Sequence, residues 1–137
     1  MNRTLRRLAS ASVTAVALGA AVLSTAAPAS AYAKDGYLEV EEFGLYYSTG
    51  GTGCVFDLSG SDNNFTDNKF RGPSGCYGYG TTANDNTESY RNRDVVTWQV
   101  WTDVYYDGSL GYIPKGYGGD ASLTFKNKIS SSNYSFS

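Results

Sequence analysis

The 137-residue sequence contains no histidine and only two cysteines. Without an imidazole, the chain can build neither a Ser-His nor a Cys-His nucleophile, nor a zinc site that depends on histidine ligands. Carboxylate pairs such as Glu41 with Glu42, or Asp103 with Asp107, are the remaining candidates for acid–base hydrolysis of a glycoside. Adjacent strand residues point to opposite faces, which disfavours the first pair. We therefore expect a protein that is not an enzyme.

Long apolar runs are confined to the start of the chain. Three arginines within the first seven residues precede a run of small and apolar residues from 8 to 27, and Ala29-Ser30-Ala31 has the small-x-small pattern that signal peptidase requires. The sequence therefore predicts a signal peptide over residues 1–31 and a single domain over residues 32–137. A retained membrane anchor is the alternative, but the run is rich in Ala, Ser and Thr. No second apolar run is long enough to span a bilayer.

Basic residues are also scarce once the signal is removed. The loss of its three arginines leaves 8 basic residues against 13 acidic ones, a formal charge of −5. Such a chain has no basic face for nucleic acid or for anionic lipid. We expect a secreted, extracellular and monomeric protein with neither nucleic acid nor a membrane as a partner.

The two cysteines, Cys54 and Cys76, have no other thiol to pair with in a chain that is exported. A disulfide between them is the natural pairing in an oxidising compartment, and two free thiols are the alternative. On the chain-entropy model, closing a loop of this length stabilises the fold by roughly 3 kcal/mol.

Tyrosine and glycine are abundant, with 12 and 16 residues. Residues 45–58 place aromatic-rich runs on both sides of Ser-Thr-Gly-Gly-Thr-Gly, which predicts a β-hairpin. Residues 104–115 repeat the pattern of a tyrosine pair ahead of a glycine, and an Asn-x-x-Ser segment closes each half. A unit that occurs twice indicates an all-β sandwich of two Greek-key motifs, motif one at about 43–93 and motif two at about 98–135.

Two further segments have a distinctive composition. Residues 34–42 alternate in polarity and are expected to form an edge strand or an ordered arm. Residues 71–82 are rich in glycine and predict an irregular insertion that Cys76 tethers to the first hairpin.

The paired hairpins and closing segments resemble the Greek-key motifs of βγ-crystallins. More closely, the chain resembles the exported actinobacterial proteins of the Streptomyces metalloproteinase inhibitor family. The likeness covers about residues 43–132. It rests on Phe43-Gly44-Leu45-Tyr46-Tyr47 with its glycine turn, Phe65-Thr66-Asp67-Asn68-Lys69-Phe70, Asn84-Asp85-Asn86-Thr87-Glu88-Ser89, and Val104-Tyr105-Tyr106 followed by Gly108.

The resemblance implies a secreted peptidase inhibitor whose partner is a secreted protease, most naturally a metalloprotease. An inhibitor of this kind offers a rigid, substrate-like segment to the cleft of the peptidase. Cys54-Val55-Phe56 is the candidate inhibitory contact, because the disulfide would pin Cys54 and Val55 offers an apolar side chain of the kind that thermolysin-like clefts favour. The alternative is that Val55 and Phe56 serve the core.

A second function is open. βγ-crystallin motifs can bind calcium through a closing segment of the form Asn/Asp-Asn/Asp-x-x-Ser/Thr-Ser, and calcium prefers such oxygen ligands. Asp85, Asn86 and Ser89 are the candidate metal ligands, whereas Lys126 in the second copy would oppose a cation. The same side chains could simply hydrogen-bond their own turn. The alternative function is therefore a calcium-binding structural or extracellular module without inhibitory activity; the inhibitor itself requires no cofactor.

A membrane-active toxin is a third class. Attack on a bilayer is helped by a cationic surface, and this chain is acidic. We rank that class last.

Overall fold

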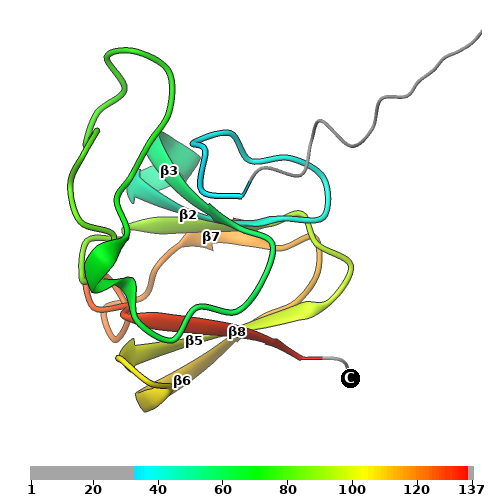
Figure 1. Ribbon diagram of the computed structural model, residues 1–137. Helices are drawn as coiled ribbons and strands as arrows, with labels where there is room; N and C mark the ends of the chain where they lie inside the picture. Colours follow the sequence, from blue (N-terminus) through cyan, green and yellow to red (C-terminus); the bar gives the residue numbers. More distant parts are fainter. Residues whose placement is uncertain (1–32, 136–137) are drawn as a thin grey trace, which may run out of the picture. The chain divides into compact units, whose positions relative to one another are not determined.

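The computed structural model describes residues 33–135, so the predicted signal peptide lies outside the described residues. The described part forms two antiparallel sheets with strand orders β3-β2-β4-β7 and β6-β5-β8 (Figure 1). It contains no helix long and apolar enough to cross a membrane. The elements are β2 (Phe43–Ser48), η4 (Thr49–Gly51), β3 (Thr52–Leu58), η5 (Phe65–Asp67), β4 (Ser89–Asn92), β5 (Thr97–Asp103), β6 (Asp107–Ile113), β7 (Gly118–Asp120) and β8 (Ser131–Ser135).

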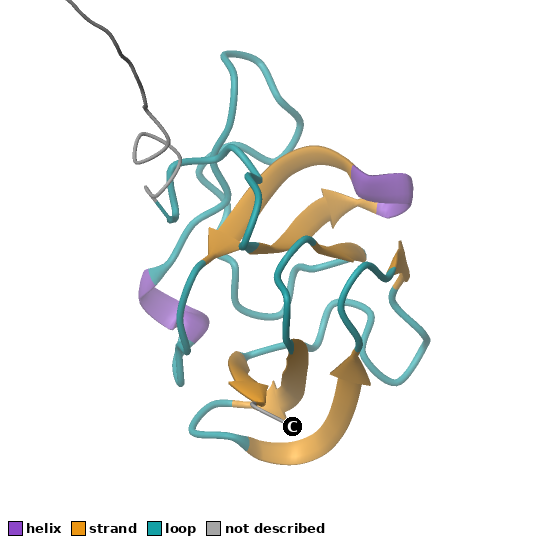
Figure 2. Cartoon of the chain, turned by 90° about the vertical axis from the view of Figure 1, so that its right-hand side faces the viewer, coloured by secondary structure: helices purple, strands orange, loops and turns teal. Residues whose placement is uncertain are grey.

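The two halves of the sequence interlock. Strand β7 belongs to the second half but pairs with β4 of the first, with Tyr90 opposite Gly119. In the other direction, Asp62 of the first half forms a bridge with Ser132 of β8. Figure 2 shows the strands in two layers, and the exchange of segments between these layers is the Greek-key arrangement that the sequence predicts.

The first predicted hairpin is confirmed. Strands β2 and β3 pair with Leu45 opposite Phe56, and η4 forms the turn between them. Gly50 adopts a φ of 69°, a conformation that glycine reaches without a steric penalty.

The second hairpin begins earlier in the sequence than expected. It consists of β5 and β6, with Trp101 opposite Leu110, so its first strand precedes residue 104. Tyr105 and Tyr106 lie in the turn with φ of 61° and 59°, whereas Tyr46 lies in the strand β2. The two tyrosine pairs are therefore not equivalent, and the repeat that they suggested has the wrong register.

A pair of buried serines marks the true repeat. Each serine begins the closing strand of its half, donates its hydroxyl to the carbonyl oxygen of the last residue of the first strand, and accepts a backbone N–H from the turn three residues later. The bonds are Ser89 to Ser48 O (2.5 Å) with Gly51 N (2.9 Å), and Ser131 to Asp103 O (2.6 Å) with Tyr106 N (3.1 Å).

This equivalence shifts the alignment of the two closing segments by one residue from the alignment that the sequence pattern suggested. Ser89 corresponds to Ser131, not to Ser130, and Asp85 corresponds to Asn127. Both Asp85 and Asn127 adopt positive φ, 61° and 57° respectively.

The core between the sheets is aromatic. Phe43 of β2 stacks on Trp98 of β5 with ring centroids 4.8 Å apart, and Phe56 meets Phe65 edge-on at 4.9 Å. All four side chains are at most 1 % exposed. Large rings thus supply the burial that a chain with few aliphatic residues needs.

Residues 33–42 form an ordered arm and not a strand. The backbone N–H groups of Lys34, Asp35 and Gly36 donate to the carboxylate of Asp57, at 2.6, 3.3 and 2.8 Å. Farther along, Leu38 and Val55 both lie over Gly44, where an added Cβ would be 2.9 Å from Leu38 and 3.2 Å from Val55. The arm therefore covers the part of the outer face of the first sheet around Gly44 and Val55, and residues 54–58 of β3 are buried.

Candidate functional site

The predicted inhibitory contact is buried. Cys54, Val55 and Phe56 are 1 %, 4 % and 1 % exposed. Cys54 and Phe56 belong to the core cluster, whereas Val55 points to the opposite face and packs under Leu38 of the arm. These three side chains therefore present no surface to a protease, because Cys54 and Phe56 face the core and the arm, which the hairpin pattern did not reveal, covers Val55.

The disulfide between Cys54 and Cys76 is present and connects this strand to an exposed segment. We call residues 71–82 the tethered loop. Arg71 and Val55 exchange backbone hydrogen bonds of 3.0 and 2.8 Å, and Cys54 donates its N–H to the carbonyl oxygen of Tyr77 at 2.9 Å. The tethered loop is thus fixed along the outer edge of β3 by covalent and hydrogen bonds.

The tethered loop presents tyrosines to solvent. Tyr77 is 72 % exposed and Tyr79 is 56 % exposed. Figure 1 shows this part of the chain as the green loop that stands away from both sheets. The ring of Tyr47 supports it from below and meets Tyr77 edge-on at 5.2 Å between centroids.

The close approach of Gly78 to the ring of Tyr47 fixes the distance between the tethered loop and β2. A Cβ on Gly78 would lie 2.2 Å from Cγ of Tyr47, and the φ of Gly78 is 92°. Only glycine allows this approach at this backbone angle. The loop is therefore exposed and is held in place by the disulfide, the hydrogen bonds to β3 and the ring of Tyr47, as a cleft-binding segment requires.

The predicted metal ligands do not converge on one point. Asp85 accepts the hydroxyl of Ser130 at 2.8 Å, and Asn86 donates to the carbonyl oxygens of Thr82 and Asn84, at 3.1 Å each. Ser89 is fully buried and holds the turn of the first hairpin. Asp85 and Ser89 thus belong to different surroundings, as expected if Ser89 serves its own fold.

An oxygen-rich hollow does border Asp85. Asn84 lies in it, with a buried side-chain oxygen that has no hydrogen-bond partner. The sequence pattern did not single out Asn84 as a ligand, because the one-residue slip in the closing segment hid its place at the head of the motif. In the described part of the chain, no three acidic, cysteine or histidine side chains gather closely enough to hold a metal ion by themselves. The hollow is lined by Asn84, Asp85, Thr102, Asp103, Val104, Tyr105, Tyr106, Asp107 and Ser130.

Two buried carboxylates hold the arm in place. Burial raises the pKa of Glu42 from 4.5 to about 7, although the backbone N–H of Glu39 opposes the shift. Burial also raises the pKa of Asp57, against the hydrogen bonds from Gly36 and its neighbours. One carboxylate oxygen of Glu42 has no partner, so its charged form is poorly solvated.

The architecture defines the class of protein first. The chain is similar to a solved structure from a study of the "Evolution of the eye lens beta-gamma-crystallin domain fold", with a TM-score of 0.56, 17 % identity, and coverage of 72 % of this chain and 90 % of that one. The fold is therefore that of a βγ-crystallin domain, as expected from the repeat.

The sequence then defines the family. The model of peptidase inhibitor family I36 matches residues 39–113, which is more than half of the chain. The chain belongs to peptidase inhibitor family I36, the family of the Streptomyces metalloproteinase inhibitor. No curated protein matches it.

Proposed function

We propose that the protein is a secreted inhibitor of peptidases, that its target is a metalloprotease, and that the tethered loop contacts the target. Membership of family I36 supports the inhibitory activity. The observation that carries the choice of surface is the exposed Tyr77 on a backbone that the adjacent Cys76 and the edge of β3 hold in place. We expect the protein to act outside the cell and as a monomer.

Rigidity and aromatic area would both favour binding. A segment that is already ordered loses little conformational entropy when it enters a cleft. Tyrosines are enriched among residues that dominate binding energy, because they bury a large surface with few rotatable bonds. In this proposal, Cys54 and Val55 do not contact the target. They position the loop, Cys54 through its disulfide to Cys76 and Val55 through its backbone hydrogen bonds to Arg71.

The test is an inhibition assay with residues 32–137 against thermolysin and, in parallel, against the serine protease subtilisin. We expect inhibition of thermolysin at micromolar concentration. Tyr77→Ala should raise the inhibition constant at least about 10-fold, the effect of losing a dominant contact residue. Tyr112→Ala, a control that removes an equally large exposed tyrosine from β6, should leave it unchanged.

Three results would argue against the proposal. If neither enzyme is inhibited, the inhibitory function fails. If only subtilisin is inhibited, the metalloprotease target is wrong. If Tyr112→Ala weakens inhibition and Tyr77→Ala does not, the contact surface lies elsewhere.

Calcium binding is a second candidate, favoured by the partnerless buried oxygen of Asn84. Asn84, Asp85 and Ser130 would offer calcium the neutral and charged oxygen ligands that it prefers. Extracellular modules bind calcium with dissociation constants of about 10⁻⁴ to 10⁻³ M. We therefore expect 10 mM calcium to raise the melting temperature, and Asp85→Asn to abolish the rise. A melting temperature that calcium leaves unchanged would dismiss this candidate.

A further inference from the structure

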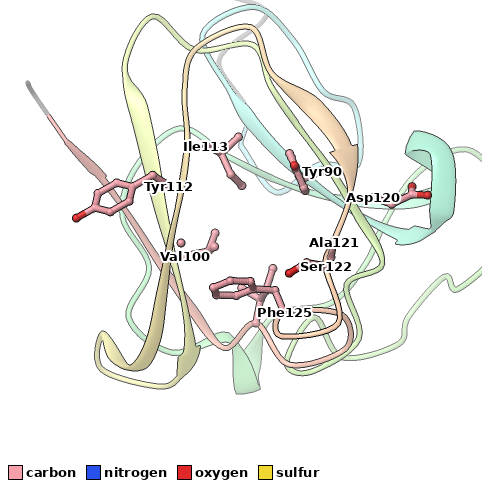
Figure 3. A pocket seen from close by; sticks show the side chains of 10 residues that line it. Tyr90, Val100, Tyr112, Ile113, Asp120, Ala121, Ser122 and Phe125 are labelled. Atoms are coloured by element: carbon pink, nitrogen blue, oxygen red, sulfur yellow. The ribbon is translucent and has the colours of Figure 1, made fainter.

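A cavity of about 220 Å³ lies between the two sheets, on elements other than the tethered loop. Its apolar walls come from Val100 of β5, Ile113 of β6 and Phe125, which follows β7. Figure 3 shows these side chains turned toward a common space, with Ser122 at its side. The cavity therefore exposes part of the interior between the layers to small molecules.

The cavity is open because of where the sheets end. Strands β6 and β7 are edge strands of different sheets, so no ladder of hydrogen bonds closes the gap between them. Gly111 of β6 carries no side chain to fill it, and a Cβ there would lie 2.9 Å from the ring of Phe125. The ring thus lies directly against the strand and leaves the adjoining space free.

The size of the cavity suits one ring. Cavities of about 150 Å³ lined by aliphatic and aromatic side chains stay dry and bind benzene. The cavity in this protein is larger by roughly the volume of two or three further heavy atoms, and it opens to solvent, since Tyr112 and Ser122 of its lining are exposed. A six-membered ring with a short substituent would fill it.

The polarity of the walls disfavours a charged ligand. Asp120 borders the cavity, but its Oδ1 accepts the N–H of Gly50 at 2.7 Å, and Figure 3 shows its carboxylate directed away from the central space. No lysine or arginine lines the cavity. Ser122 and Tyr90 bring neutral hydroxyls to its walls, whereas Figure 3 shows the hydroxyl of Tyr112 directed away from the central space. Since burying an unpaired charge is costly, a neutral molecule should bind better than a charged molecule of the same shape.

We propose that this cavity is a binding site for a small neutral molecule with an aromatic or branched aliphatic body and one hydroxyl group, which hydrogen-bonds with Ser122. The ligand would displace weakly held water from apolar walls and would leave no charge unpaired. This site goes beyond the inhibition of peptidases, because it shares no residue with the tethered loop.

The experiment titrates residues 32–137 with benzyl alcohol, benzylamine and benzoate and follows backbone amide shifts by NMR. Benzyl alcohol should shift the amides of Gly111, Ile113 and Ser122, with a dissociation constant on the order of 1 mM for a ligand with so few heavy atoms. Benzylamine and benzoate should bind at least about 5-fold more weakly, because each charge loses hydration against apolar walls and the carboxylate of Asp120, which is hydrogen-bonded to Gly50, is directed away from the central space.

Three variants separate the site from unspecific adsorption. Ala121→Leu fills the cavity and should weaken the binding of benzyl alcohol at least about 10-fold. Ser122→Ala should weaken the binding of benzyl alcohol about 3-fold or more. Toluene, which lacks the hydroxyl, should bind to this variant as it binds to the wild type. Leu123→Ala is the matched control, since Leu123 is 86 % exposed beside the cavity without lining it, and should change nothing.

The proposal is overturned if the three probes bind equally well or not at all. It is also overturned if Ala121→Leu and Ser122→Ala, each with a native-like amide spectrum, bind benzyl alcohol as the wild type does. Peptidase inhibition is measured in parallel and should be the same in all variants, so failure of this site and failure of the inhibitory function are distinguishable.

Discussion

The hydroxyl of Ser131 donates to the carbonyl oxygen of Asp103 at 2.6 Å and accepts the N–H of Tyr106 at 3.1 Å. One fully buried side chain thus bridges both ends of the turn that joins β5 and β6. Ser89 does the same for the first hairpin. The two serines are the points where closing strand and turn are joined in each half.

Removal of either hydroxyl should therefore destabilise the fold. Ser131→Ala and Ser89→Ala each leave a buried carbonyl oxygen and a backbone N–H without their partner, and we expect each to lower the free energy of unfolding by about 1–3 kcal/mol. Chemical denaturation measures the effect. Ser59→Ala, at an exposed position, is the control and should change stability by less than about 0.5 kcal/mol. Equal stability of all three variants would contradict the bridging role.

Stability should fall as the pH rises from about 4.5 to about 7. In this interval the unfolded chain has released the proton of Glu42, whereas the folded chain retains it because burial raises the pKa to about 7. The folded state then binds more protons, so stability declines with rising pH. The raised pKa of Asp57 acts in the same direction. The part due to Glu42 is on the order of 3 kcal/mol.

Glu42→Gln tests this assignment. The neutral amide should remove most of the decline and make the protein more stable than the wild type above pH 7. Unfolding free energies at pH 5 and pH 8 measure the difference. Glu41→Gln, at the adjacent exposed position, should retain the decline. If Glu42→Gln loses stability between the two pH values as the wild type does, another group is responsible.

Reduction of the disulfide should affect both stability and inhibition. The bond between Cys54 and Cys76 spans 22 residues of sequence, and its loss should lower the free energy of unfolding by roughly 3 kcal/mol. Cys76→Ser is the suitable variant, because Cys54 is buried and Cys76 is partly exposed. A protein that stays folded after this change should inhibit its target more weakly, since the tethered loop is no longer fixed. Undiminished inhibition would exclude a role for the tether.

Two glycines of the tethered loop offer a matched comparison. Both Gly78 and Gly75 have positive φ, 92° and 84°, so alanine is strained at either position. At Gly75 the added Cβ meets open space, whereas at Gly78 it would collide with the ring of Tyr47. Gly78→Ala should therefore lower stability by at least about 1 kcal/mol more than Gly75→Ala, as measured by thermal unfolding. Equal losses would mean that the ring moves aside freely.

Local pattern was enough to predict the first hairpin, the disulfide and the aromatic sandwich. The glycine turn after Tyr47 is specified by nearby residues, and the pairing of Cys54 with Cys76 follows from the absence of any other cysteine. The position of Val55 was not predictable in this way, because its burial depends on Leu38 of an arm that has no regular structure.

The register of the repeat failed for a related reason. Tyr105 and Tyr106 resemble a strand pair in sequence, but they adopt positive φ in a turn. What relates the two halves is a hydrogen-bond pattern centred on Ser89 and Ser131. That pattern joins residues that are 41 and 28 positions apart, so no local window of sequence contains it.

The bond between Cys54 and Cys76 also determines the product that forms if a peptidase cleaves the tethered loop ahead of Cys76. A peptidase that hydrolysed the backbone between Gly72 and Gly75 would leave the new ends on two chains that remain covalently linked. The nicked molecule would differ from the intact one by a single water and would separate into fragments only after reduction. Because the severed ends stay close together, resynthesis of the peptide bond could compete with escape from the enzyme.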